Sequence, residues 1–184
     1  MVSVVSLWLP ILVAAVLVFV VSSVIHTVLK YHQSDFGAVP DEAKVRSGLQ
    51  GLPPGDYVVP HAPSNEARQT EEFKAKMREG PVAFLTVLPP GDIKMGSSLA
   101  QWFGYCLLVG LFAAYVAGEA LPAGARYLDV FQIAGAVAFA GYGLALLQGS
   151  IWYKRKWSST LKSVFDALIY GLVTAGTMGW LWPG

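Results

Sequence analysis

The sequence has few charged residues, a single cysteine, and no charge over its first 29 positions. Only 14% of its 184 residues are Asp, Glu, Lys or Arg, whereas soluble domains carry about 25%. The lone cysteine, Cys106, excludes an intrachain disulfide. A net charge of +1 argues against nucleic acid as a partner, because that function needs a concentrated basic surface.

Motifs that carry catalysis are missing as well. The sequence has no Gly-rich phosphate-binding loop, no zinc-binding cysteine and histidine pattern, and no Ser/His/Asp arrangement with a supporting context. We therefore expect a protein that is not an enzyme, with no catalytic residue, no metal site and no cofactor.

What the chain has instead is four long apolar stretches and a mean hydropathy of +0.50. About 20 apolar residues in a helix cross the ~30 Å hydrocarbon core of a bilayer. The sequence thus predicts an all-α membrane protein with four transmembrane helices. The lipid bilayer is therefore an expected partner. The stretches lie at 1–29, 97–118, 127–153 and 160–182, which divides the chain into a first helix (1–30), an insert (31–96) and helices two to four (97–184).

Basic residues predict the orientation, because Lys and Arg near the ends of spans favour the cytoplasmic side. The insert carries several of them, and the turn between the last two stretches holds Lys154, Arg155 and Lys156. The turn between the second and third stretches holds only Arg126. The six tryptophans lie near the ends of the stretches, as expected at the interface. The insert is therefore predicted to be cytoplasmic, with the N-terminus and the C-terminus outside.

The insert is predicted to contain short helices and extended segments. Residues 41–48 form a candidate helix that Gly48 would stop, and residues 70–79 form a second, with Thr70 as N-cap and Gly80 as stop. Residues 57–60 are a brief extended piece. The apolar run 81–88 is too short to span, so it must pack on the insert, lie in the interface, or cover a partner protein.

Small residues predict where helices approach closely. The last stretch has Gly171, Ala175 and Gly179 at four-residue spacing, and such faces allow close backbone contact in membranes. The contact is either within the chain or with other membrane subunits or a second copy.

Polar residues at membrane depth are candidate functional groups, because burying them is costly. Asp166 leads, with Tyr170, Thr174 and Thr177 roughly along its face, and Lys162 one turn earlier as a candidate ion-pair partner. This stripe has two interpretations, a path for a proton or solute, or hydrogen bonding between helices.

His26 is the second candidate. A histidine in a membrane helix can bind haem, a pigment or a metal, but the chain has no second histidine at membrane depth. His32 and His61 fall in the insert, and a His26/His32/His61 metal site has no diagnostic spacing. We expect His26 to form hydrogen bonds at the interface, with cofactor binding as the alternative.

The last third carries Ser-Ile-Trp-Tyr-Lys-Arg-Lys-Trp at 150–157, Asp-Ala-Leu-Ile-Tyr at 166–170 and Gly-Trp-Leu-Trp-Pro at 179–183. In these segments it resembles uncharacterised small bacterial four-span inner-membrane proteins. The resemblance implies the bacterial inner membrane as location and carries no activity.

Three functions follow as hypotheses. The first is a non-catalytic accessory or scaffolding subunit of a larger membrane complex, favoured by the small-residue faces, the run 81–88 and the missing catalytic motifs. The second is a small proton-coupled or solute transporter using the stripe that begins at Asp166, although the inverted repeat of many transporters is missing. The third is a cofactor-binding redox subunit using His26.

Overall fold

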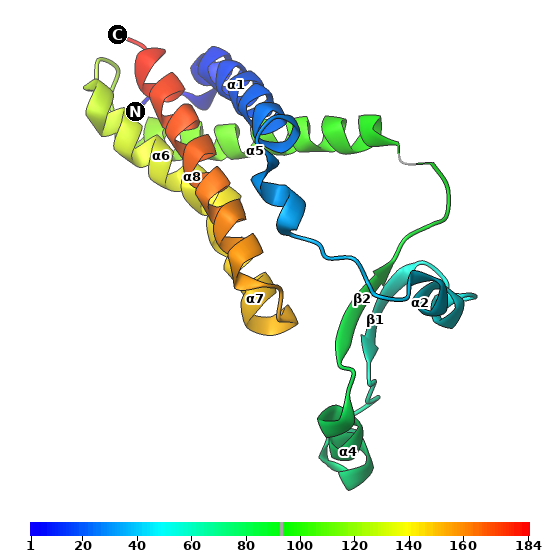
Figure 1. The fold of residues 1–184 in the computed structure, drawn as a ribbon. Coiled ribbons are helices and arrows are strands. Elements are labelled where there is room, and N and C mark those ends of the chain that lie inside the picture. Colours follow the sequence, from blue (N-terminus) through cyan, green and yellow to red (C-terminus); the bar gives the residue numbers. More distant parts are fainter. Residues whose placement is uncertain (93) are drawn as a thin grey trace. The chain divides into compact units, whose positions relative to one another are not determined.

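The protein, analysed as a computed structural model that describes residues 1–92 and 94–184, is mostly helical and divides into two compact units (Figure 1). The first unit joins Met1–Gly37 to Lys94–Gly184, and we call it the helical unit. The described residues between them, 38–92, belong to the second, which we call the insert unit. Residues 31–37 and 94–96, which composition groups with the insert, thus belong to the helical unit.

Three segments in the described chain are long and apolar enough to cross a membrane. Three of the four predicted stretches are therefore candidate spans, as expected of a membrane protein. The first joins a 3-10 turn, η1 (Val4–Leu7), to helix α1 (Trp8–Thr27). The second is α5 (Met95–Ala120). The third, Tyr127–Tyr153, consists of α6 (Tyr127–Gly143), a 3-10 turn η3 (Leu144–Leu146) and α7 (Leu147–Tyr153).

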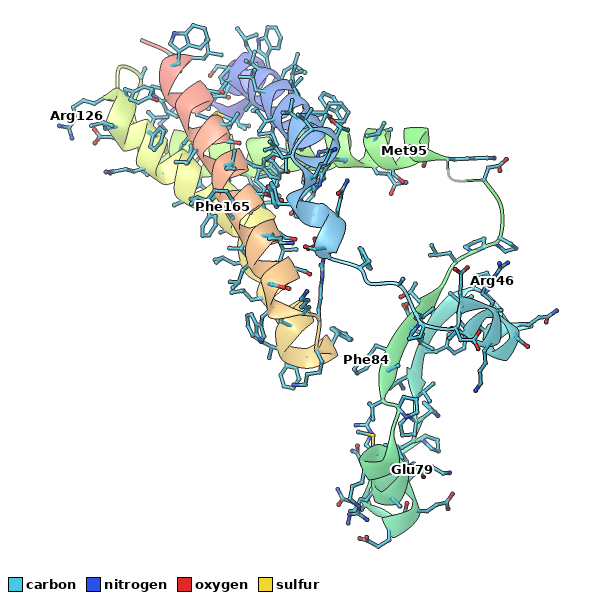
Figure 2. The ribbon with its side chains drawn as sticks, in the orientation of Figure 1. Arg46, Glu79, Phe84, Met95, Arg126 and Phe165 are labelled. Atoms are coloured by element: carbon cyan, nitrogen blue, oxygen red, sulfur yellow. The ribbon has the colours of Figure 1, made fainter. Side chains whose placement is uncertain are left out.

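The fourth predicted stretch forms helix α8 (Trp157–Trp180), 24 residues long. It is not among the three segments that are apolar enough to span, because Lys162, Asp166 and several hydroxyl residues interrupt it. Most of these polar side chains face the interior, whereas Phe165, labelled in Figure 2, is 58% exposed. Its crossing of the membrane stays a prediction.

Helices α6 and α8 pack closely through small residues. A methyl group built on Gly135 of α6 would lie 2.9 Å from the Cβ of Ala175. One built on Gly171 would lie 3.2 Å from the backbone nitrogen of Phe139. One built on Gly179 would lie 2.8 Å from the ring of Tyr127. The predicted face of Gly171, Ala175 and Gly179 is therefore occupied by α6 of the same chain.

Both chain termini lie at one end of the helical unit (Figure 1). The backbone nitrogen of Val2 donates to the carbonyl of Gly118 near the end of α5, at 2.7 Å. The backbone nitrogen of Gly124, in the turn between α5 and α6, donates to the carbonyl of Pro183 at 2.8 Å. Arg126 projects from the same turn (Figure 2). Because α8 starts where α7 ends and returns to this turn, it runs alongside the whole of α6.

The insert unit contains α2 (Glu42–Leu49), α3 (Asn65–Gln69) and α4 (Glu71–Glu79). The α4 prediction is confirmed, because the Thr70 hydroxyl accepts from the nitrogen of Phe73 and Gly80 ends the helix at φ 68°. The stop predicted at Gly48 is wrong, since α2 continues through it to Leu49.

The two extended pieces of the insert unit pair as a hairpin that the sequence did not predict. Strands β1 (Gly55–Val59) and β2 (Ala83–Val87) are antiparallel, with Gly55 opposite Val87 and Val59 opposite Ala83. The apolar run 81–88 therefore packs partly on the insert itself. None of the described residues in this unit is buried.

Candidate functional site

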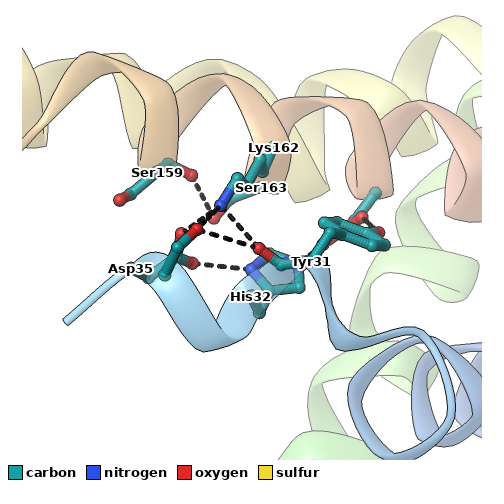
Figure 3. Close-up of polar contacts among 8 residues, drawn as sticks. Tyr31, His32, Asp35, Ser159, Lys162 and Ser163 are labelled. Atoms are coloured by element: carbon teal, nitrogen blue, oxygen red, sulfur yellow. Dashed lines mark hydrogen bonds and ion pairs between the residues drawn. The ribbon is translucent and has the colours of Figure 1, made fainter.

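A polar cluster lies between α8 and the segment that directly follows α1. After α1 ends at Thr27, a short 3-10 helix, η2 (Lys30–Ser34), lies against α8. Lys162 of α8 holds it there (Figure 3). The Lys162 ammonium donates to the carbonyl of Tyr31 at 2.6 Å, to the hydroxyl of Ser34 at 2.8 Å and to the carboxylate of Asp35 at 2.9 Å. One α8 side chain thus fixes the backbone of η2.

The centre of the cluster is the imidazole of His32, which lies between two carboxylates. Its Nδ1 is 2.7 Å from Oδ2 of Asp35, and its Nε2 is 2.7 Å from Oδ2 of Asp166. The hydroxyl of Tyr31 donates to the other oxygen of Asp166. Asp166 is 3% exposed. A buried carboxylate is costly unless it is hydrogen-bonded, and these two donors satisfy that requirement.

The charges of η2 respond to this arrangement. The hydrogen bond with His32 lowers the pKa of Asp35 to about 2, and the hydrogen bond from Lys162 adds to this effect against the opposing effect of burial. Burial alone would lower the pKa of His32, but its hydrogen bonds to Asp35 and Asp166 prevail and raise it. Burial, and then the hydrogen bond to Asp166, raises the pKa of Tyr31. Asp35 is therefore ionised and Tyr31 neutral at pH 7.

His26 adds a second imidazole to the cluster. It lies in the last turn of α1, is exposed, and its ring centroid is 4.7 Å from that of His32. Ligand atoms of His26, His32 and Asp166 all lie within 4.8 Å of one another. The helical unit thus brings together His26, His32 and Asp166, whereas His61 belongs to the insert unit.

The predicted stripe on α8 faces the interior of the helical unit. Asp166, Tyr170, Thr174 and Thr177 are all buried. The two threonine hydroxyls donate to carbonyls of their own helix, at 2.9 Å and 2.8 Å. The Tyr170 hydroxyl is buried without a hydrogen-bond partner among the described residues.

Aromatic rings pack around Tyr170, one turn from Asp166. Its ring centroid lies 5.8 Å from that of Trp102 on α5 and 5.5 Å from that of Tyr142 on α6. The Trp102 indole donates to the hydroxyl of Ser22 on α1, at 2.8 Å. These contacts link α1, α5 and α6 to the stripe on α8.

One predicted contact is wrong. Lys162 is a candidate ion-pair partner of Asp166 from its spacing, but its ammonium instead donates to Tyr31, Ser34 and Asp35, whereas Asp166 is engaged by Tyr31 and His32. Tyr31 and Asp35 were not predicted as site residues, and His32 was considered only in a metal site with His26 and His61. A signal was present in the three-residue spacing of His32 and Asp35 directly after the span that ends near His26.

Comparison with known proteins adds no further assignment. No family model, no curated protein and no solved structure matches the chain. The resemblance of the last third to small bacterial membrane proteins therefore stays a prediction. The cluster offers two imidazoles, two carboxylates and one ammonium group at the end of a buried polar stripe.

Proposed function

We propose that the protein is a small multi-pass membrane transporter for cations, with Asp166 as its central binding group. The observation that carries the proposal is the burial of this carboxylate within an apolar helical unit, at the start of an inward-facing polar stripe. Ionisable groups within membrane proteins are rare, face the interior, and commonly mark ion pathways.

The proposed path continues beyond Asp166 along the stripe of α8 and is closed in this conformation. The rings of Tyr170, Trp102 and Tyr142 close it. The unpaired hydroxyl of Tyr170 is unusual, since buried polar atoms almost always have a partner. A passing cation or its water would supply that partner when the rings move apart.

The small-residue faces no longer favour the accessory role, because α6 and α8 use them on each other. Packing within one chain leaves the α8 stripe enclosed on the side of α1, α5 and α6. An enclosed polar stripe is what a transport path requires, whereas a subunit interface requires exposed complementary surface.

The proposed topology has four spans, with α8 as the fourth. It is supported by the contacts that bring both termini to the turn between α5 and α6, which an odd number of crossings would separate. The insert joins the opposite ends of α1 and α5, and the positive-inside rule makes that side cytoplasmic. Both termini are then outside, and the resemblance suggests the bacterial inner membrane.

Cation flux into vesicles tests the transport proposal. The full-length protein is reconstituted with ion-sensitive dyes trapped inside, and a panel of monovalent and divalent cations is added outside. We expect uptake of at least one cation, reduced about tenfold or more by Asp166→Asn. The matched control is Asp129→Asn, a carboxylate in the first turn of α6 that pairs with Arg126. Rates equal to those of empty vesicles for every cation would overturn the proposal.

The accessory role remains the second candidate, and the insert unit favours it. None of its described residues is buried, and a two-stranded hairpin is marginally stable alone. Leu88, after β2, is 72% exposed. If a companion subunit covers this segment, it co-purifies in stoichiometric amount and Leu88→Glu releases it, whereas Leu52→Glu in the turn before β1 does not. A single chain species in mild detergent would remove this candidate.

A further inference from the structure

We propose that His26, His32 and Asp166 form a binding site for a divalent first-row transition-metal ion. The inference names the cation of the transporter, so its physiological role rests on the proposed function, although the binding itself does not. It contradicts the expectation from sequence that the chain has no metal site, which was based on motif spacing alone.

The ligand atoms are close enough for one ion. They lie within 4.8 Å of one another, and Nε2 of His32 is 2.7 Å from Oδ2 of Asp166. Metal bonds to imidazole nitrogen and carboxylate oxygen are about 2.0–2.2 Å long, so two ligands on a tetrahedral ion are about 3.4 Å apart. Binding therefore needs shifts of about 1 Å, and it releases to water the proton shared by Nε2 of His32 and Oδ2 of Asp166, because a ligand nitrogen must be unprotonated.

The groups around the ligands are those that orient ligands in metal sites. A histidine ligand usually gives its other ring nitrogen to a carboxylate or carbonyl, which fixes its orientation. Here Nδ1 of His32 contacts Asp35, which Lys162 holds at 2.9 Å. Tyr31 donates to Oδ1 of Asp166, the oxygen that His32 does not contact. Nε2 of His32 and Oδ2 of Asp166 are thereby directed at each other.

The donor set selects the class of ion. Two imidazoles and one carboxylate suit zinc, iron(II), cobalt(II) or nickel(II), whereas magnesium and calcium prefer oxygen ligands throughout. Haem does not fit between the two histidines, because their ring centroids are 4.7 Å apart and the rings are inclined at 43°. A macrocycle held between two axial imidazoles would separate them much further.

The site is suited to an ion that exchanges. Three protein ligands leave at least one coordination position for water, in contrast to the closed four-ligand sites of structural zinc. Exposure also changes across the site, from exposed His26 through half-buried His32 to buried Asp166. An ion would enter past His26 and be passed towards Asp166, where the stripe of α8 begins.

Equilibrium binding of cobalt(II) tests the proposal. The full-length protein in detergent is stripped with a chelator and titrated with Co²⁺ while visible ligand-field absorption is recorded. We expect one Co²⁺ per chain, displaced by Zn²⁺. His26→Ala should weaken binding about tenfold or more, because it removes one ligand while leaving the contacts between His32, Asp35 and Asp166. The matched control, His61→Ala in the insert unit, should bind as the native protein does.

Two results would overturn the metal site. One is no saturable absorption band in the native protein. The other is equal affinity in the native protein and His26→Ala, or equal weakening by His61→Ala, which would show adventitious binding only. Binding without uptake into vesicles would overturn transport and keep the site. Uptake of a cation by protein that binds no Co²⁺ would do the reverse.

Discussion

The ammonium of Lys162, on α8, lies 2.6 Å from the carbonyl oxygen of Tyr31, 131 residues earlier in the chain. The same group also contacts Ser34 and Asp35. A single side chain therefore fastens the segment after the first helix to the last helix. The positions of Tyr31, His32 and Asp35 depend on that attachment, since all three lie in the fastened segment.

Removing this attachment should destabilise the helical unit. In Lys162→Met the charged hydrogen bonds to η2 are lost, and such bonds contribute about 1.5–3 kcal/mol. We expect the free energy of unfolding to fall by about 2 kcal/mol, measured by thermal unfolding in detergent. Lys156→Ala, in the exposed turn before α8, is the control and should change it by less than about 0.5 kcal/mol. Equal stability of both variants would show that Lys162 does not hold η2.

Asp35 should act on metal affinity through His32. In Asp35→Asn the carboxylate that orients the imidazole is lost while its size is kept, and such partners affect metal affinity about 10- to 100-fold. We expect Co²⁺ binding to weaken by that factor with one ion still bound per chain. Asp129→Asn serves as the control, since Asp129 pairs with Arg126 at the other end of the helical unit. An unchanged affinity in Asp35→Asn would contradict its positioning role.

Close packing of α6 and α8 should make Gly171 sensitive to one added methyl group. In Gly171→Ala the new Cβ would lie 3.2 Å from the backbone nitrogen of Phe139, so the backbone of α6 must shift by a few tenths of an ångström. Overpacking of this kind costs about 1–3 kcal/mol, measured as a lowered unfolding temperature. In Gly104→Ala on α5 the Cβ meets nothing within 4 Å. That control should be neutral or slightly stabilised by its higher helix propensity.

Labelling of single cysteines should establish the number of crossings. Native Cys106 is 1% exposed and should not react with a membrane-impermeant maleimide, so single cysteines can be added to the unchanged chain. With four spans, Ala123→Cys and Gly184→Cys should react in intact cells. Ser64→Cys, in the insert unit, should react only after the membrane is opened.

The labelling of Gly184→Cys decides whether α8 crosses the membrane. If Gly184→Cys reacted only in opened cells while Ala123→Cys reacted in intact ones, α8 would not cross the membrane. The contacts between residues 122–124 and residues 182–183 would then need another explanation, because Trp182 donates to the carbonyl of Pro122 and Gly124 donates to that of Pro183.

The sequence alone predicted those features that depend on local chemistry, namely the apolar helices, the helix caps and one buried acid. Long uncharged runs predict membrane helices because the cost of burying charge in lipid depends on each residue and little on its neighbours. Caps are equally local, which is why Thr70 and Gly80 mark α4 correctly. Asp166 was singled out for the same reason, as an acid inside an apolar stretch.

Tertiary structure decided the rest, because it depends on contacts between residues distant in the chain. His32 meets Asp166 across 134 positions, and no spacing rule links them. The spacing predicted Asp166 as the partner of Lys162. The structure gives it three other acceptors, because the chain after α1 folds back against α8. The small residues of the last stretch predicted close helix packing. Only the tertiary structure shows that their partner is α6 of the same chain.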